Sequence, residues 1–398
     1  MSPLRRILYG SIMLLLAAAL LELFAFGILS FEAWRRPHKF RHDAAYYLDP
    51  MPAGWAAKFY AEAYDPVLGW DGLRYDGLNE GTKDRAKTSN LGYDAHGARL
   101  NPDYATEPAL IAAYGDSFTK GAEVAWNKTW AYDLSVMLGR YVANYGVGGY
   151  GPDQATIKFQ RSPTDAPQPA IAILGIFEEN INRVLNRYRA YYQEEPTSFL
   201  AFKPRFLPGP EGGRLLPSPL AAATEDRARL AAAVVTARQD DVFWGRKVDR
   251  AFPYSLALGK LALLALGKIT EAPLPLGELS DNLWNEPNAR ATMDAVVDSF
   301  VAEAAERGIR PVILFLPLVR REAGEDRAAW SPKYSAYLGS LRSRYRDRSV
   351  TLLDVADADF EAAKMHVRLY DGHYSPYGNA VVAKFLFDRL HLADAFPE

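Results

Sequence analysis

A serine, a histidine and an aspartate lie at positions where side chains do chemistry in an α/β protein. A Gly-Asp-Ser turn directly follows the apolar run 109–114, so Ser117 is predicted at a strand-to-helix turn with its backbone N–H at a helix N-terminus. His373 lies between the fifth predicted strand and the last predicted helix, two residues after Asp371. A serine hydroxyl needs an imidazole to take its proton, and the imidazole needs a carboxylate to orient it. These residues predict Ser117 as a nucleophile, His373 as its base and Asp371 as the orienting acid.

A glycine-rich run supplies candidate donors for the alkoxide that such a nucleophile creates. The run NYGVGGYG at 144–151 follows the second predicted strand, and its glycines let backbone N–H groups approach an oxyanion closely. The run also fits the G-x-G-x-x-G pattern of dinucleotide sites, which is expected after the first strand of the fold. A complete strand and helix unit precedes it here, which favours an oxyanion hole over a nicotinamide or flavin site.

Taken together and in this order, the motifs resemble the SGNH (GDSL-like) hydrolase superfamily. GDSFTKG resembles its serine block, NYGVGGYG its glycine block, ILGIFEENINR the position of its asparagine block, and DGHYSPYGN its Asp and His block. The resemblance implies the roles of Ser117, His373 and Asp371 given above, and it adds the backbone N–H groups of Ser117 and Gly149 as oxyanion donors. It implies no metal and no organic cofactor.

Two motifs depart from the family pattern. The asparagine block usually reads Gly-x-Asn-Asp, whereas this chain has GIFEENIN at 175–182. Asn180 is our first choice for the side-chain donor and Asn182 the second; an ionised Glu179 there would repel an oxyanion, because a carboxylate only accepts hydrogen bonds. The Asp-x-His spacing of the last block resembles polysaccharide O-acetyltransferases, whereas many members have Asp-x-x-His, and this favours acyl transfer to a sugar.

The resemblance therefore implies a serine-dependent acyl-ester hydrolase or O-acyltransferase, with acetyl as the group and an O-acetylated envelope glycan as the substrate. The alternative is a catalytically silent carbohydrate-binding or envelope-assembly module on the same fold. Forty-six Lys and Arg against 48 Asp and Glu leave a charge of -2, which argues against a nucleic-acid partner. The chain has no cysteine, which excludes thiol catalysis and Cys-ligated metals.

Alternating strand and helix patterns must position these residues. The alternation predicts an α/β fold, a three-layer α/β/α arrangement with a five-stranded parallel, flavodoxin-like sheet. We assign an SGNH-like domain to 109–390, with 183–286 as an insertion and candidate lid, and 33–108 as a loop-rich segment that packs on the body. Within the insertion, Arg183, Arg187 and Arg189 fit a solvated amphipathic helix better than a sugar cleft. The predicted strands are 109–114, 141–145, 170–176, 311–316 and 350–355.

The N-terminus is apolar enough to cross a membrane. The run 7–31 contains one charge, Glu22, and at about 1.5 Å per residue it exceeds a hydrocarbon core of about 30 Å. We expect a membrane anchor at 1–32 rather than a cleaved signal peptide, because the run continues past the small residues 17–19. Basic residues after the span favour a cytoplasmic body. The resemblance instead implies a single-pass protein with an extracytoplasmic (periplasmic) body, which is our expectation.

A second apolar stretch lies in the insertion at 256–266. Its composition predicts a helix that packs on the body. Docking on the membrane surface beside the anchor is the alternative.

Overall fold

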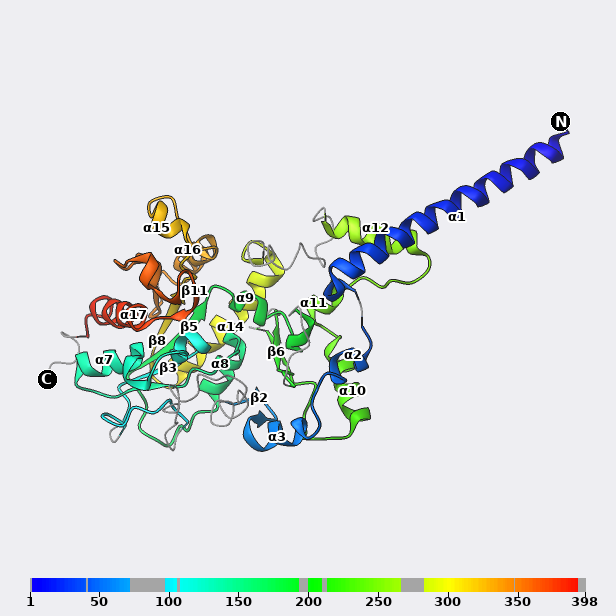
Figure 1. Cartoon of the computed structure of the whole chain (residues 1–398). Coiled ribbons are helices and arrows are strands. Elements are labelled where there is room, and N and C mark those ends of the chain that lie inside the picture. Colours follow the sequence, from blue (N-terminus) through cyan, green and yellow to red (C-terminus); the bar gives the residue numbers. More distant parts are fainter. Residues whose placement is uncertain are drawn as a thin grey trace.

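The computed structural model describes residues 2–40, 42–71, 97–105, 108–192, 200–209, 213–265, 283–346 and 348–392. Its centre is a five-stranded parallel sheet in the order β4-β3-β5-β8-β9 (Figure 1). This order confirms the predicted flavodoxin-like arrangement, in which ligands bind outside the carboxyl ends of the strands. The strands are β3 (Ile111–Tyr114), β4 (Val142–Asn144), β5 (Ile171–Phe177), β8 (Arg310–Leu316) and β9 (Thr351–Asp354).

The sheet separates two hydrophobic cores. Along β5, Ala172, Leu174 and Ile176 face one core, whereas Ile171 and Ile173 face the other, because successive side chains of a strand point to opposite faces. The helices α8 (Pro152–Gln160), α14 (Pro287–Glu306) and α16 (Ser335–Arg344) contribute to the first core. The helices α7 (Trp130–Leu138) and α17 (Pro376–Arg389) contribute to the second. Both faces are covered, as a parallel sheet requires.

Several short helices and one hairpin lie outside the five-stranded sheet. An antiparallel hairpin of β10 (His366–Arg368) and β11 (Asp371–Tyr374) stands where the sequence indicated only a loop. The others are α6 (Ser117–Lys120), α9 (Asn180–Arg183), α15 (Glu322–Glu325), η2 (Trp126–Lys128), η4 (Val355–Asp357) and η5 (Ala362–Lys364).

The insertion is fastened to the body by a buried ion pair. Lys203 binds the Asp153 carboxylate of α8 and donates to the carbonyl oxygen of Arg183 at 3.0 Å. Removing one partner of such a pair leaves the other charge buried without a partner, which lowers the free energy of unfolding by about 3–5 kcal/mol. The insertion contains η3 (Arg189–Tyr191), β6 (Arg205–Leu207), β7 (Arg214–Leu216), α10 (Arg227–Ala237), α11 (Val242–Gly245) and α12 (Tyr254–Ala265).

One long apolar helix, α1 (Pro3–Arg35), begins the chain and is long and apolar enough to cross a membrane. It projects away from the body, and α12 lies beside the part of α1 nearest the body (Figure 1). The following segment reaches the body through Trp70 and Leu68, which contact the glycine-rich loop and α8. Its elements are η1 (Pro37–Lys39), α2 (Ala44–Leu48), α3 (Trp55–Glu62), β1 (Tyr64–Asp65) and β2 (Gly69–Trp70).

Candidate active site

Ser117 is the first residue of α6, directly beyond the carboxyl end of β3. Asp116 caps this helix, because its Oδ1 accepts a hydrogen bond from the Phe118 N–H at 2.8 Å. Gly115 permits the sharp turn, since a Cβ there would lie 2.0 Å from Thr119 Oγ1. Ser117 is 8% exposed. The structure thus places Ser117 at the strand-to-helix turn that the sequence predicted.

The glycine-rich loop beyond β4 lies against this turn. Val147 N–H donates to the Gly115 carbonyl at 3.0 Å, and Gly149 takes a left-handed φ of +80° that favours glycine. Trp70 Nε1 holds the loop from the N-terminal segment by donating to the Gly148 carbonyl at 3.1 Å. Within the described part of the chain, neither the Ser117 nor the Gly149 backbone N–H donates a hydrogen bond.

Among the three candidates of the asparagine block, Asn180 is the one that reaches the serine turn. It is fully buried; its Oδ1 accepts from the Phe177 N–H at 2.8 Å, and its Nδ2 donates to Asp116 Oδ2 at 2.9 Å. An amide carries two N–H donors, so one remains beyond the Asp116 bond. Glu179 is exposed, and Asn182 makes no described contact with the turn.

Two arginines that the sequence assigned to a solvated helix are buried instead. Arg183 donates to Asp116 Oδ2 at 3.0 Å and to the Tyr150 carbonyl at 2.9 Å. Burial acts to lower the pKa of Arg183, but Asp116, Tyr192 and Glu179 together outweigh it, so that pKa is raised. Arg187 donates to backbone carbonyls, including that of Pro217 at 2.8 Å. The segment 180–191 forms the short helices α9 and η3 rather than one amphipathic helix. Arg183 and Arg187 bind buried acceptors in place of water.

His373 approaches the serine turn from the β10–β11 hairpin. Its ring lies 5.0 Å, centroid to centroid, from the ring of Phe118, the residue after Ser117. The His373 Nδ1 atom lies 3.0 Å from Glu123 Oε2, and the His373 backbone N–H donates to the same oxygen at 3.0 Å. Glu123 itself has a left-handed φ of 66°, a sparsely populated conformation for a residue with a side chain.

Among the described residues, Asp371 makes no hydrogen bond or ion pair with His373. Its carboxylate accepts from the Gly372 N–H at 2.7 Å and from Arg368 Nε at 3.2 Å, and its side chain is 75% exposed. Two residues two apart on a regular strand share a face, but Gly372 has a φ of +76° and interrupts the extended conformation. The carboxylate beside His373 Nδ1 is therefore that of Glu123, and not that of Asp371 as the sequence predicted.

Glu123 is the site residue that the sequence did not indicate. Burial acts to raise the pKa of its carboxyl, but hydrogen bonds from His373 and the charge of Arg368 outweigh it and lower the pKa. Arg99 holds the chain on both sides of Glu123 by donating to the Lys120 carbonyl at 2.5 Å and the Val124 carbonyl at 2.6 Å. No spacing pattern links Glu123 to a histidine 250 residues away.

The structure records no hydrogen bond between Ser117 and His373 among the described residues. Catalytic hydrogen bonds are often long without substrate and shorten when substrate binds. The contact of Phe118 with His373 keeps the two elements adjacent. Within the described residues, no group of three His, Cys, Asp or Glu side chains is arranged to hold a metal ion.

His366 supports the hairpin that carries His373. It is buried; its Nε2 accepts from the Val319 N–H at 3.2 Å, so its proton lies on Nδ1, which donates to the Gly372 carbonyl at 2.9 Å. Burial lowers the pKa of His366 below its usual 6.5. The unfolded chain therefore binds a proton near pH 6.5 while the folded chain does not, so this residue's contribution to stability is lost as pH falls below about 6.5.

We expect the free energy of unfolding to depend less on pH, between about pH 7.5 and 5.5, in His366→Gln than in the unmutated protein. Urea unfolding at both pH values measures it. The comparison with the variant is needed because Asp354 titrates in the same range, its pKa raised by burial to about 6. Equal pH dependence in both proteins would show that His366 is not held neutral.

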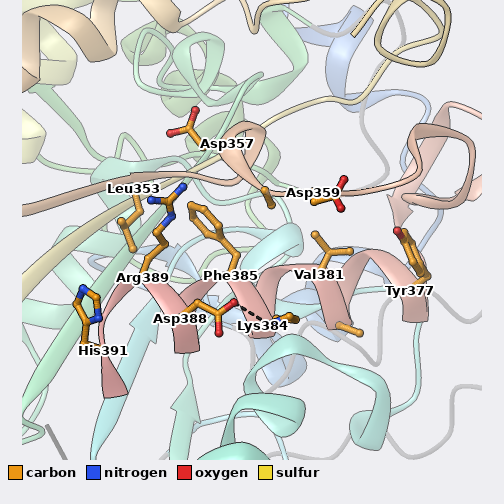
Figure 2. Close-up of a pocket in the computed structure, with 12 residues that line it drawn as sticks. Leu353, Asp357, Asp359, Tyr377, Val381, Lys384, Phe385, Asp388, Arg389 and His391 are labelled. Atoms are coloured by element: carbon orange, nitrogen blue, oxygen red, sulfur yellow. Dashed lines mark hydrogen bonds and ion pairs between the residues drawn. The ribbon is translucent and has the colours of Figure 1, made fainter. Parts of the chain in front are cut away.

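A groove of about 890 Å³ lies between α17 and the segment 353–359 (Figure 2). It is lined by η4, the end of β9 and α17, and it includes neither Ser117 nor His373. Two of its charged groups are paired: Lys384 with Asp388 at 2.7 Å, and Asp357 with Arg342 at 3.3 Å. It supplies no residue to the chemistry at the sheet edge.

The fold and the site define an α/β/α protein with a serine turn, a glycine-rich loop and a buried asparagine at one sheet edge. No family model and no curated protein matches the chain. Solved structures that it is similar to include a G-D-S-L family protein from Desulfitobacterium hafniense, at 12% identity over 69% of this chain and 95% of that chain, with a TM-score of 0.35. Another is a member of the lipolytic G-D-S-L family from Veillonella parvula, at 10% identity over 70% of this chain and 96% of that one, with a TM-score of 0.33.

An acetyl xylan esterase from Butyrivibrio proteoclasticus is also similar, at 11% identity over 75% of this chain and 67% of that chain, with a TM-score of 0.31. At these identities and TM-scores the similarities carry no weight for activity, and the fold stands on the strand order.

Proposed function

We propose that this chain is a serine-dependent enzyme that hydrolyses an acyl ester or transfers its acyl group, with Ser117 as nucleophile. The observation that supports it best is the pair of unbonded N–H groups, on Ser117 and Gly149, beside a serine whose neighbour Phe118 packs on His373. Two such donors are what a developing oxyanion requires. The four motifs, in the order of the SGNH hydrolases, support the same activity.

In the proposed reaction, Ser117 Oγ attacks the ester carbonyl carbon while His373 takes the hydroxyl proton. The carbonyl oxygen becomes an oxyanion that accepts from the N–H groups of Ser117 and Gly149 and from the remaining N–H of Asn180. The intermediate then breaks its bond to the alcohol oxygen, and His373 returns the proton to that oxygen. Water or a sugar hydroxyl attacks the acyl-serine by the same steps in reverse and frees Ser117.

We assign the orientation of His373 to Glu123 rather than Asp371. Glu123 Oε2 lies 3.0 Å from Nδ1, which keeps the proton there and leaves Nε2 to act as base. The carboxylate also stabilises the imidazolium that forms when Ser117 loses its proton.

The substrate class and the location extend the same proposal. The Asp-x-His spacing, which resembles polysaccharide O-acetyltransferases, supports acetyl as the acyl group and an envelope glycan as its carrier. We place α1 across a membrane as the anchor, with the body extracytoplasmic (periplasmic) and the insertion as a lid. We take α1 as an uncleaved anchor because its apolar run continues past the small residues 17–19, where a signal peptide would be cleaved.

The experiment that tests the activity is to trap the acyl-enzyme. The full chain, purified in detergent, is expected to release p-nitrophenol from p-nitrophenyl acetate and to carry an acetyl group on the peptide that contains Ser117. Peptide mass spectrometry after acid quenching measures it. Faster turnover on adding an oligosaccharide, with acetyl recovered on the sugar, assigns transfer rather than hydrolysis.

A second candidate, the silent binding module, is favoured by one observation, the missing hydrogen bond between Ser117 and His373 among the described residues. If the chain binds a glycan but yields neither p-nitrophenol nor an acetyl adduct, the module replaces the enzyme.

A further inference from the structure

The single charge in the apolar part of α1 has partners in the insertion. Glu22 accepts hydrogen bonds from the Tyr254 N–H at 2.5 Å, from the Ser255 N–H at 3.3 Å and from the Ser255 hydroxyl. These two residues are the first two of α12. Glu22 therefore caps α12, and its negative charge lies at the helix end that carries positive partial charge.

The helix α12 runs alongside α1 toward the body. At its start, the Tyr254 ring lies 5.0 Å from that of Phe26. At its end, Leu264 packs in one cluster with Leu29 and Phe40. The two helices lie side by side over the half of α1 nearest the body (Figure 1). The apolar stretch that the sequence assigned to packing on the body thus packs on α1.

The start of α12 lies well inside the apolar run of α1. Glu22 precedes the end of the run at Phe31 by nine residues, or about 14 Å of helix, roughly half of a hydrocarbon core of about 30 Å. The chain leaves the body at Val248, whose N–H donates to the Lys39 carbonyl at 2.9 Å. Residues 249–253 must therefore descend along α1 before α12 returns.

From Phe252 onward, the exposed side chains of this segment include large apolar ones. Phe252 and Leu256 are each 71% exposed and Leu263 is 43% exposed, whereas the exposed charged residues Asp249 and Arg250 lie at the end of the descent nearest the body. The one charged side chain of α12 turns back to the body, because Lys260 Nζ donates to the Lys247 carbonyl at 3.2 Å. Large exposed apolar side chains grouped in this way are typical of a surface that contacts a membrane or another protein.

We propose that the segment 251–265 is a re-entrant hairpin that inserts into the leaflet on the body side of the membrane, beside α1, with lipid acyl chains covering Phe252, Leu256 and Leu263, while Asp249 and Arg250 stay at the membrane surface. Backbone groups at membrane depth must be satisfied within the protein. Glu22 meets that need at the exposed end of α12. The inference rests on the proposed membrane anchor, not on the esterase activity.

The chain has no cysteine, so single-cysteine variants carry one label each. Nitroxide is placed at Leu256→Cys, at Leu14→Cys on α1 and at Val235→Cys on α10, an exposed apolar position of the body. The full chain is reconstituted in phosphatidylcholine and phosphatidylglycerol nanodiscs, and collisions with oxygen, which partitions into lipid, are compared with those of water-soluble nickel chelate. We expect oxygen to dominate at positions 14 and 256 and the nickel chelate at 235.

Each other outcome is decisive. Nickel access at 256 with oxygen access at 14 refutes the hairpin while the anchor stands. Nickel access at both refutes the anchor and the hairpin together. Protection of 256 from both reagents shows that protein, not lipid, covers it, and refutes the proposal.

A second pair of variants tests the role of Glu22. Glu22→Ala removes the acceptor and is expected to shift the label at 256 toward nickel access, because the first N–H groups of α12 then need water. Glu22→Gln retains an acceptor oxygen and is expected to keep oxygen access. The same oxygen access in both variants contradicts the capping role.

Discussion

Replacing Ser117 with alanine is expected to lower kcat for p-nitrophenyl acetate by at least about 10⁴-fold, because no other group can form the acyl-enzyme. His373→Ala is expected to cost about as much, and the double variant little more, since the two residues act as a unit. Initial rates and the acetyl adduct are measured together. Ser117 makes no side-chain hydrogen bond among the described residues, so the free energy of unfolding should change by less than about 0.5 kcal/mol.

Ser135→Ala is the matched control. The Ser135 hydroxyl is buried, accepts from the Val142 N–H at 3.1 Å and donates to the Ala131 carbonyl at 2.8 Å. Removing it leaves the Val142 N–H without its partner and is expected to destabilise the fold by about 1–3 kcal/mol while activity per folded molecule stays. A Ser117→Ala protein that keeps its activity would place the nucleophile elsewhere.

The sheet and three parts of the site were predictable because each motif directly follows a buried strand. Parallel strands bring their carboxyl ends to one edge. Ser117 after β3, Gly149 after β4 and Asn180 after β5 therefore meet without any knowledge of the loops. The choice of Asn180 over Glu179 rested on donor chemistry, and the structure gives Asn180 the contact with Asp116.

Parts that depend on local backbone conformation or on distant pairing were not predictable. The left-handed conformations of Tyr370 and Gly372 turn Asp371 away from His373, and no sequence pattern announces a positive φ at Tyr370. The burial of Arg183 depends on Asp116, 67 residues earlier in the chain. The position of α12 depends on Glu22, 233 residues before Ser255. The composition of α12 was compatible with packing on the body or with docking at the membrane. It could not indicate that Glu22 would be its hydrogen-bond partner.

Exchanging Glu123 for glutamine is expected to lower kcat by about 10³-fold with little change in KM, because the neutral side chain no longer stabilises the imidazolium and can hold His373 in the wrong tautomer. Asp371→Asn, the matched control two residues from His373, is expected to change kcat by less than about 3-fold, since Asp371 contacts Arg368 and solvent. Michaelis parameters of both variants at one pH measure the contrast.

The pH profile of kcat/KM distinguishes two roles of Glu123: orienting His373, or only stabilising the fold. If Glu123 stabilises protonated His373, its removal makes the imidazole easier to deprotonate, so the acid limb of kcat/KM should move to lower pH in Glu123→Gln and stay in place in Asp371→Asn. A loss of folding would lower kcat/KM at every pH without moving the limb. The reverse pattern, with Asp371→Asn inactive and Glu123→Gln active, would mean that substrate binding straightens the strand at Gly372 and brings Asp371 to Nδ1.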